Sequence, residues 1–119
     1  MNDESILTSI KKLLGITEAY EQFDPDIIVC INSVLATLTQ LGVGSPKGFA
    51  IADKKAVWKD LLGDDQRLNL VKSYVHMKVR MMFDPPQSSA VADAINRTAQ
   101  ELEWRILAVT DFPNADAKL

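Results

Sequence analysis

Residue types that carry most protein chemistry are sparse in this chain of 119 residues. It contains one histidine, His76, and one cysteine, Cys30. A zinc site needs several ligands of these types, so we expect no metal site. A single cysteine also excludes an internal disulfide. Cys30 lies in an apolar helical run, which is typical of a buried and unreactive thiol.

Short catalytic motifs are also missing from the sequence. We find no glycine-rich phosphate loop, no CxxC pair, no HExxH and no GxSxG nucleophile elbow. Acidic residues gather between positions 18 and 26, but a connector and a helix cap account for them. Because no nucleophile–base pair or metal constellation stands out, the sequence predicts no catalytic residue, no cofactor and no enzyme.

One row of polar side chains remains as a candidate surface. Lys72, His76 and Arg80 are spaced four apart and therefore share one face of a predicted helix. Such rows are usually a solvated face, and the alternative is a contact surface for a partner or for nucleic acid. Trp104, which lies off the apolar stripe of a later helix, is a further candidate interface residue, because tryptophan is enriched at interface hot spots.

Charge and hydropathy narrow the class of protein. The formal net charge is −3, which argues against a protein whose main task is to grip duplex DNA. Apolar residues make up 47% of the chain, enough for the core of one domain. No apolar run reaches the roughly 20 residues of a membrane span, and the N-terminus has no signal-peptide pattern. We therefore expect a soluble protein made in a cytoplasm, with no membrane partner.

The helices that must position the candidate surface residues lie within positions 65–107. Two amphipathic helices are predicted there, joined by an elbow over 83–88. Before the elbow, apolar residues recur in helical steps at Leu68, Val71, Val75, Val79 and Met82, and after it at Val91, Ile95, Ala99, Leu102 and Ile106. Pro85 and Pro86 cannot continue a helix and push Asp84 out of the α region. We expect a helical hairpin whose angle the elbow sets.

The whole chain is predicted to be all-α, a small antiparallel helical bundle with a central irregular loop and an extended C-terminal tail. Helices are expected near 4–14, 25–41, 65–82 and 88–107, with Lys11 and Lys12 in the last turn of the first, where cations suit the helix dipole. The glycine-rich stretch 42–51 is the loop, with a weak strand signal at 49–51. The helical domain is assigned to 1–108, and the tail to 109–119, where Pro113 and polar residues oppose further helix.

The elbow and its flanking helices resemble the head-to-tail connector (adaptor) family of long-tailed bacteriophages. The pattern is a helix that ends Arg-x-x-Phe-Asp-Pro-Pro, followed by a helix that ends Glu-x-x-x-Arg. The likeness extends to the segment 57–63 and covers most of residues 5–107. The residues that carry it here are Arg80, Phe83, Asp84, Pro85, Pro86 and Arg105.

What the resemblance implies is a structural protein of the virion rather than an enzyme. Members are expected to form a ring, dodecameric on the particle, that docks beneath the portal protein and extends the DNA channel. The ring would carry the next connector or tail-completion protein, and DNA would pass through its lumen without specific binding. Its location would be the head–tail junction of the virion, after assembly in the host cytoplasm. The C-terminal segment is expected to engage the portal.

The residues themselves leave one alternative open. Doubled apolar stripes on the second and third predicted helices offer more apolar surface than one small bundle readily hides, and self-association in a ring would cover it. The alternative is a small helical regulatory or DNA-binding module, supported only by the row that contains Lys72. That alternative predicts a dimer whose affinity for duplex DNA falls with salt.

Arg105 is the motif residue whose partner can be argued from geometry. It lies about 25 Å along its helix from the elbow, so it cannot reach Asp84 of its own chain. We expect it to pair with Asp64 or Asp65, at the same end of the hairpin, or with an acidic residue of the next subunit. The pair between subunits is the one favoured here.

Overall fold

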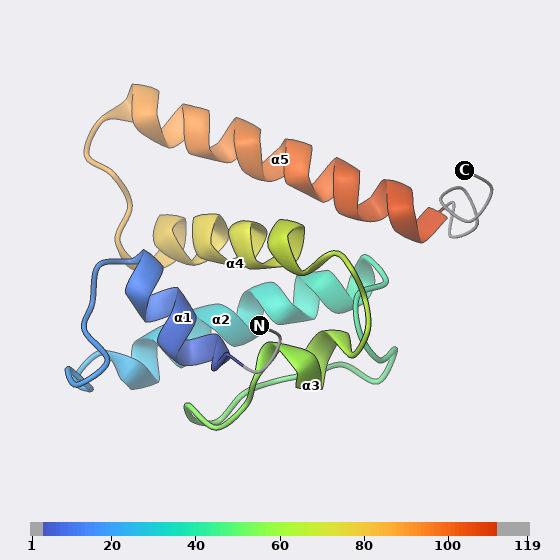
Figure 1. Cartoon of the computed structure of the whole chain (residues 1–119). Coiled ribbons are helices and arrows are strands. Elements are labelled where there is room, and N and C mark those ends of the chain that lie inside the picture. Colours follow the sequence, from blue (N-terminus) through green and yellow to red (C-terminus); the bar gives the residue numbers. More distant parts are fainter. Residues whose placement is uncertain (1–3, 112–119) are drawn as a thin grey trace.

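The computed structural model describes residues 4–111, and this part of the chain is helical with no strand (Figure 1). The elements are α1 (Ile6–Leu13), α2 (Asp24–Gln40), α3 (Trp58–Leu62), α4 (Leu68–Phe83) and α5 (Ser89–Asp111). The predicted all-α fold is confirmed. Each of the four predicted helices is present with ends shifted by a few residues, and α3 is a short additional helix.

The C-terminal end of α5 differs from the prediction. This helix continues to Asp111, so residues 109–111, predicted to open an extended tail, are helical. The physical reason is that Pro113 restricts mainly the residue directly before it, which leaves the backbone up to Asp111 free to stay helical. The remainder of the predicted tail, 112–119, lies outside the described residues.

Helix α4 is the centre of the subunit. It packs against α2 on one side and against α5 on the other, while α1 contacts both α2 and α4 (Figure 1). The apolar faces predicted from helical spacing meet in one core. Its fully buried members include Ile27, Ile31, Leu35, Leu38, Val71, Tyr74, Val75 and Val79.

Buried polar contacts tie α1 to α3 and to the segment before it. Ser5 caps α1 by accepting a hydrogen bond from the Thr8 amide at 3.2 Å. Trp58 is fully buried, and its Nε1 donates to the Ser9 hydroxyl at 2.8 Å. The backbone of Ser5 also forms an isolated antiparallel bridge with Val57. The start of the chain and the start of α3 are therefore held together.

The irregular loop after α2 is anchored although the weak strand signal at 49–51 is not realised. Asn32 on α2 binds the backbone of Ile51 twice: its Nδ2 donates to the carbonyl at 2.9 Å and its Oδ1 accepts from the amide at 2.7 Å. Gly44 has a φ of +78°, and a Cβ there would lie 2.9 Å from Leu61 Cδ1. The loop therefore needs a glycine at this position, and its backbone groups are satisfied by a side chain instead of a second strand.

Lys11 and Lys12 both lie in the last turn of α1, as predicted, but their surroundings differ. Lys12 is exposed, whereas Lys11 is 2% exposed. Its Nζ donates to the carbonyl oxygens of Glu18 at 3.0 Å and Tyr20 at 2.7 Å, and lies 2.8 Å from Asp24 Oδ1. The buried ammonium thus fastens the α1–α2 connector onto the start of α2, because a buried charge is tolerated only when it is fully paired.

Arg67 links the start of α4 to α5 at the end of the α4–α5 hairpin that lies away from the elbow. Its Nε donates to both oxygens of Asp65 at 2.9 and 3.0 Å, and its Nη1 donates to the Ile106 carbonyl at 3.1 Å. Asp65 Oδ1 also accepts from the Arg67 amide. This local turn explains why α4 begins at Leu68 instead of at the predicted residue 65, since the carboxylate offers the backbone an alternative to the first helical turn.

Candidate assembly surface

The elbow forms where the sequence predicts it. Asp84 has φ −147° and ψ 68°, outside the helical region, and its amide makes the last α4 bond to the Arg80 carbonyl at 2.9 Å. Pro85 is exposed and Pro86 half-buried. On the far side, Ser88 Oγ accepts from the Val91 amide at 3.3 Å and caps α5. The two prolines therefore separate two complete helices.

Phe83 joins the elbow to the start of α2 through aromatic contacts that the sequence analysis missed. Its ring packs edge-on against Phe23 at 5.4 Å between centroids, and Phe23 packs in the same way against Tyr20 at 5.4 Å. Phe23 is 40% exposed and Tyr20 44% exposed. No helical periodicity links residues sixty positions apart, so only the tertiary structure could reveal this cluster, which presents apolar surface at the elbow end of the subunit.

The row on α4 is not the open basic face that was expected. Lys72 Nζ lies 2.7 Å from Glu4 Oε1, and this hydrogen bond lowers the pKa of the Glu4 carboxyl. His76 is half-buried and packs near the end of α1, and its Nε2 has no hydrogen-bond partner among the described residues. Burial and then the nearby Arg80 charge lower the pKa of His76. Glu4 and the end of α1 therefore cover part of this row.

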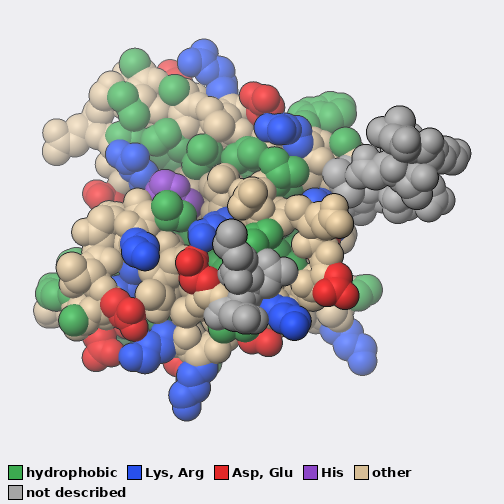
Figure 2. Space-filling view, in the orientation of Figure 1, with side chains coloured by type: hydrophobic (Ala, Val, Ile, Leu, Met, Phe, Trp, Pro, Cys, Tyr) green, Lys and Arg blue, Asp and Glu red, His purple; other side chains and the backbone are tan. Residues whose placement is uncertain are grey.

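The apolar stripe of α5 is only half covered by its own subunit. Ala99, Leu102 and Ile106 are buried against α4, whereas Val91 is 44% exposed and Ile95 only half-buried. The uncovered half borders an open groove of about 310 Å³ between α4 and α5. The groove is lined by Met77, Ala90, Val91, Ala94, Ile95 and Thr98. In Figure 2, hydrophobic side chains gather along the crevice below α5.

The far end of α5 carries the other candidate residues. Trp104 is 75% exposed, the largest exposed fraction among the exposed large apolar side chains of the described region. Glu103 accepts a hydrogen bond from the Tyr74 hydroxyl at 2.8 Å, which holds this end of α5 on α4. Burial, and then this hydrogen bond, raises the pKa of Tyr74. Arg105 is exposed and forms no ion pair within the described part of the subunit. Asp65, one of the candidate partners within the chain, is instead bound by Arg67.

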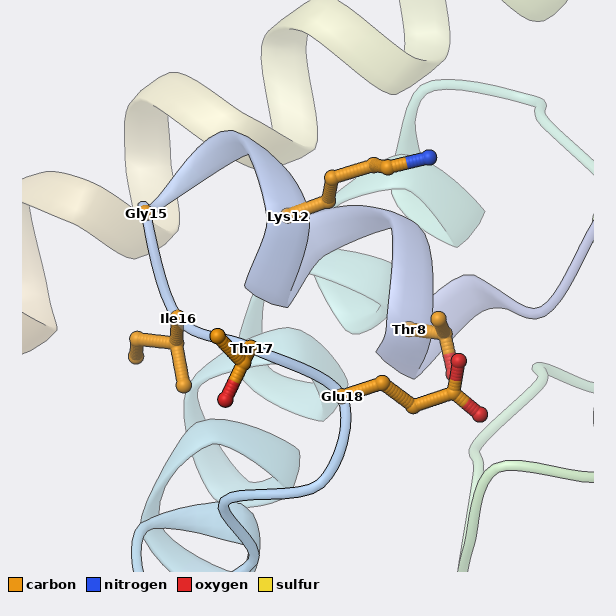
Figure 3. A pocket seen from close by; sticks show the side chains of 6 residues that line it. All are labelled: Thr8, Lys12, Gly15, Ile16, Thr17 and Glu18. Carbon is orange, nitrogen blue, oxygen red and sulfur yellow. The ribbon is translucent and has the colours of Figure 1, made fainter.

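The hollow beside α1 offers no convergent chemistry. The pocket beside α1, of about 370 Å³, has Thr8, Lys12, Thr17 and Glu18 in its lining. Figure 3 shows that the Lys12 amine and the Glu18 carboxylate do not point toward one another. Within residues 4–111 no group of three His, Cys, Asp or Glu residues could hold a metal ion, and no helix is long and apolar enough to cross a membrane.

Comparison with known families bears on the choice between the structural and the regulatory interpretation. A family model described as phage connector protein matches residues 6–112, which is most of the chain. The chain belongs to the phage connector protein family. No curated protein and no solved structure matches it. The suspected resemblance is confirmed, and the family gives this chain a structural role as a connector in the phage particle.

In this phage connector, the motif residues divide between the two ends of the α4–α5 hairpin. Arg80 and the elbow lie at one end, while Arg105 lies at the other, about 24 Å away along α5. The motif therefore does not form one compact site. It marks two ends of a surface that the phage connector leaves exposed, with apolar groups at each end.

Proposed function

We propose that this phage connector forms the head-to-tail ring of the particle. The ring, a dodecamer on the particle, docks on the portal protein, extends the DNA channel and joins the capsid to the next connector or tail-completion protein. The subunit is made in the host cytoplasm and ends at the head–tail junction. The observation that carries the proposal is the family match over residues 6–112.

The distribution of exposed apolar residues supports a subunit that works in an assembly. The elbow end presents Phe23, Met82 and Val91, each 40–46% exposed, and the opposite end presents Trp104. Large apolar side chains exposed on one surface of a small domain often mark a site of contact with another protein. A subunit with a neighbour on either side covers them.

Charge supports passage of DNA without tight binding. The chain is acidic overall, with a formal net charge of −3, and Lys72 is neutralised by Glu4. Because phosphate neutralisation creates most of the affinity for duplex DNA, such a subunit has little with which to grip it. The competing interpretation, a small helical regulatory or DNA-binding module, loses support because the row that favoured it is partly covered and paired.

The test is to remove the protein from a phage that encodes it. A stop codon early in the gene should yield DNA-filled heads without tails, and supplying the wild-type protein from a plasmid should restore tailed particles. Purified portal should retain the wild-type chain in a pull-down. Tailed, infectious particles at normal yield without the protein would refute the proposal, and salt-sensitive, tight binding to duplex DNA would favour the alternative.

A further inference from the structure

We propose that Trp104 of one subunit enters the α4–α5 groove of the next subunit, so that the groove takes a second copy of this chain. The inference rests on the proposed ring and names the contact that would build it. The two halves of the contact are both present on each subunit: an exposed indole at one end of α5 and an open apolar groove at the other.

The groove has the chemistry of a site for an apolar ring. Its lining is formed by Met77 on α4 and by residues 90–98 of α5, and the only hydroxyl among them is that of Thr98. That hydroxyl is occupied, since Thr98 Oγ1 donates to the Ala94 carbonyl at 2.9 Å. The volume of about 310 Å³ is open to solvent on the side of Val91. Filling it would cover the half of the α5 stripe that α4 leaves bare.

Trp104 is turned away from its own core. It lies two residues before the buried Ile106, which places it about 160° around the helix from that residue. The α5 residues that line the groove lie six to fourteen positions earlier, about 9–21 Å along the helix, so Trp104, which projects from the opposite side of α5, does not fill the groove of its own chain. An indole that is 75% exposed can bury about 150–250 Å² on a partner, which makes it the strongest single anchor on this surface.

The charges beside the two halves are complementary. The hollow next to Trp104 includes Arg97, Glu101 and Glu103 in its lining and is net negative. On the groove side, Arg80 lies three positions after Met77 on α4 and is therefore its neighbour on the same face of the helix. When Trp104 of one copy approaches the groove of another, the carboxylates beside the indole therefore meet Arg80 at the end of α4, which favours this register.

The placement also favours a head-to-tail arrangement over a two-fold dimer. The groove opens between α5 and α4, whereas Trp104 projects from the side of α5 turned away from α4. Each subunit therefore offers its indole to one neighbour and its groove to the other. Repetition of such a contact gives a ring when the rotation between subunits closes.

The first test follows the environment of Trp104 directly. The other tryptophan, Trp58, is fully buried within the subunit, so a change in fluorescence on association reports Trp104. Emission and acrylamide quenching are measured across a dilution series, with sedimentation velocity giving the assembly state, for the wild type and for Trp104→Phe. Because Trp104 supplies nearly all of the quenchable emission, we expect most of the quenchable fraction to be lost on assembly in the wild type only. If the free chain stays monomeric, the same quenching measurement on its complex with portal decides whether Trp104 is buried on assembly.

The second test separates the two halves of the contact. Trp104→Ala removes the anchor, and Ala94→Arg, at an exposed position, blocks the groove. Each variant alone should assemble at least tenfold more weakly than the wild type, whereas the matched control Val29→Ala, an exposed apolar residue on α2, should not. A 1:1 mixture should stop at heterodimers, because only one anchor and one open groove remain per pair. Circular dichroism confirms that each variant is folded.

The outcomes distinguish this contact from the function that it serves. Rings in which Trp104 stays freely quenchable, wild-type assembly by Trp104→Ala, or a two-fold dimer would overturn the contact and leave the connector role intact. Protection of Trp104 by portal without self-association would assign the groove or the indole to a different protein and also overturn it. Failure of the wild type to join particles would instead refute the proposed function.

Discussion

Replacing Lys11 by methionine tests the most consequential buried charge of this subunit. Methionine keeps an unbranched apolar stem in the same space but removes the ammonium that binds the carbonyls of Glu18 and Tyr20 and the carboxylate of Asp24. Loss of one partner of a buried ion pair typically costs about 3–5 kcal/mol, because the other charge is left uncompensated. Asp24 is 20% exposed and can partly return to water, so we expect about 3 kcal/mol.

A loss of this size is a large part of the total stability of a small domain, which is about 5–15 kcal/mol. For a chain of this length it corresponds to a fall in Tm of about 10–20 °C, measured by circular dichroism at constant pH. The matched control is Lys12→Met, since Lys12 is the exposed neighbour in the same helical turn. Hydrogen exchange should also show faster opening of residues 16–23, which Lys11 fastens to α2.

Melting of the two variants within about 2 °C of each other, a difference well below 1 kcal/mol for a domain of this size, would refute the stabilising role of the Lys11 ammonium. That result would mean that water or rearrangement of the connector replaces the ammonium at no cost. A double-mutant cycle with Asp24→Asn separates the ion pair from the two carbonyl bonds. We expect a coupling of about 1–3 kcal/mol between the two positions, because they touch and share the same buried environment.

Three further predictions concern the elbow, the end of α5 and the lone histidine. Replacing Pro85 and Pro86 together by alanine should leave helix content in circular dichroism nearly intact but lower the yield of tailed particles, and normal yield would contradict this. Arg105→Ala should leave the Tm of the monomer within about 2 °C yet weaken the ring on dilution and in raised salt, since exposed same-chain pairs contribute only about 0–1 kcal/mol. For His76, burial and the Arg80 charge place the pKa in the folded state below its unfolded value of about 6.5, so the unfolded chain binds the proton more readily and stability falls as the pH drops through about 6.5. Denaturant midpoints between pH 7.5 and 5.5 should therefore fall more steeply for the wild type than for His76→Gln, and parallel slopes would show that the histidine does not contribute.

Much of the architecture follows from the sequence because it depends on near neighbours. Apolar spacing of three and four residues specifies which side of each helix avoids water, and it placed α2, α4 and α5 within a few residues. Pro85 and Pro86 interrupt the helix through covalent geometry alone, which no tertiary contact can override. The motif around the elbow was likewise visible without any structure, and the family match agrees with it.

Only the tertiary structure decided which of these features are covered and by what. Periodicity predicts that Val91 and Ile106 share a stripe, yet Ile106 is buried and Val91 is 44% exposed, because α4 covers only one half of α5. Lys11 and Lys12 look equivalent in sequence, but the connector folds back over the first and leaves the second in water. Arg67 gave no signal at all, since its partner Ile106 lies 39 positions away. Which residues pair across such separations depends on how the helices pack against one another, and local sequence patterns do not specify that packing.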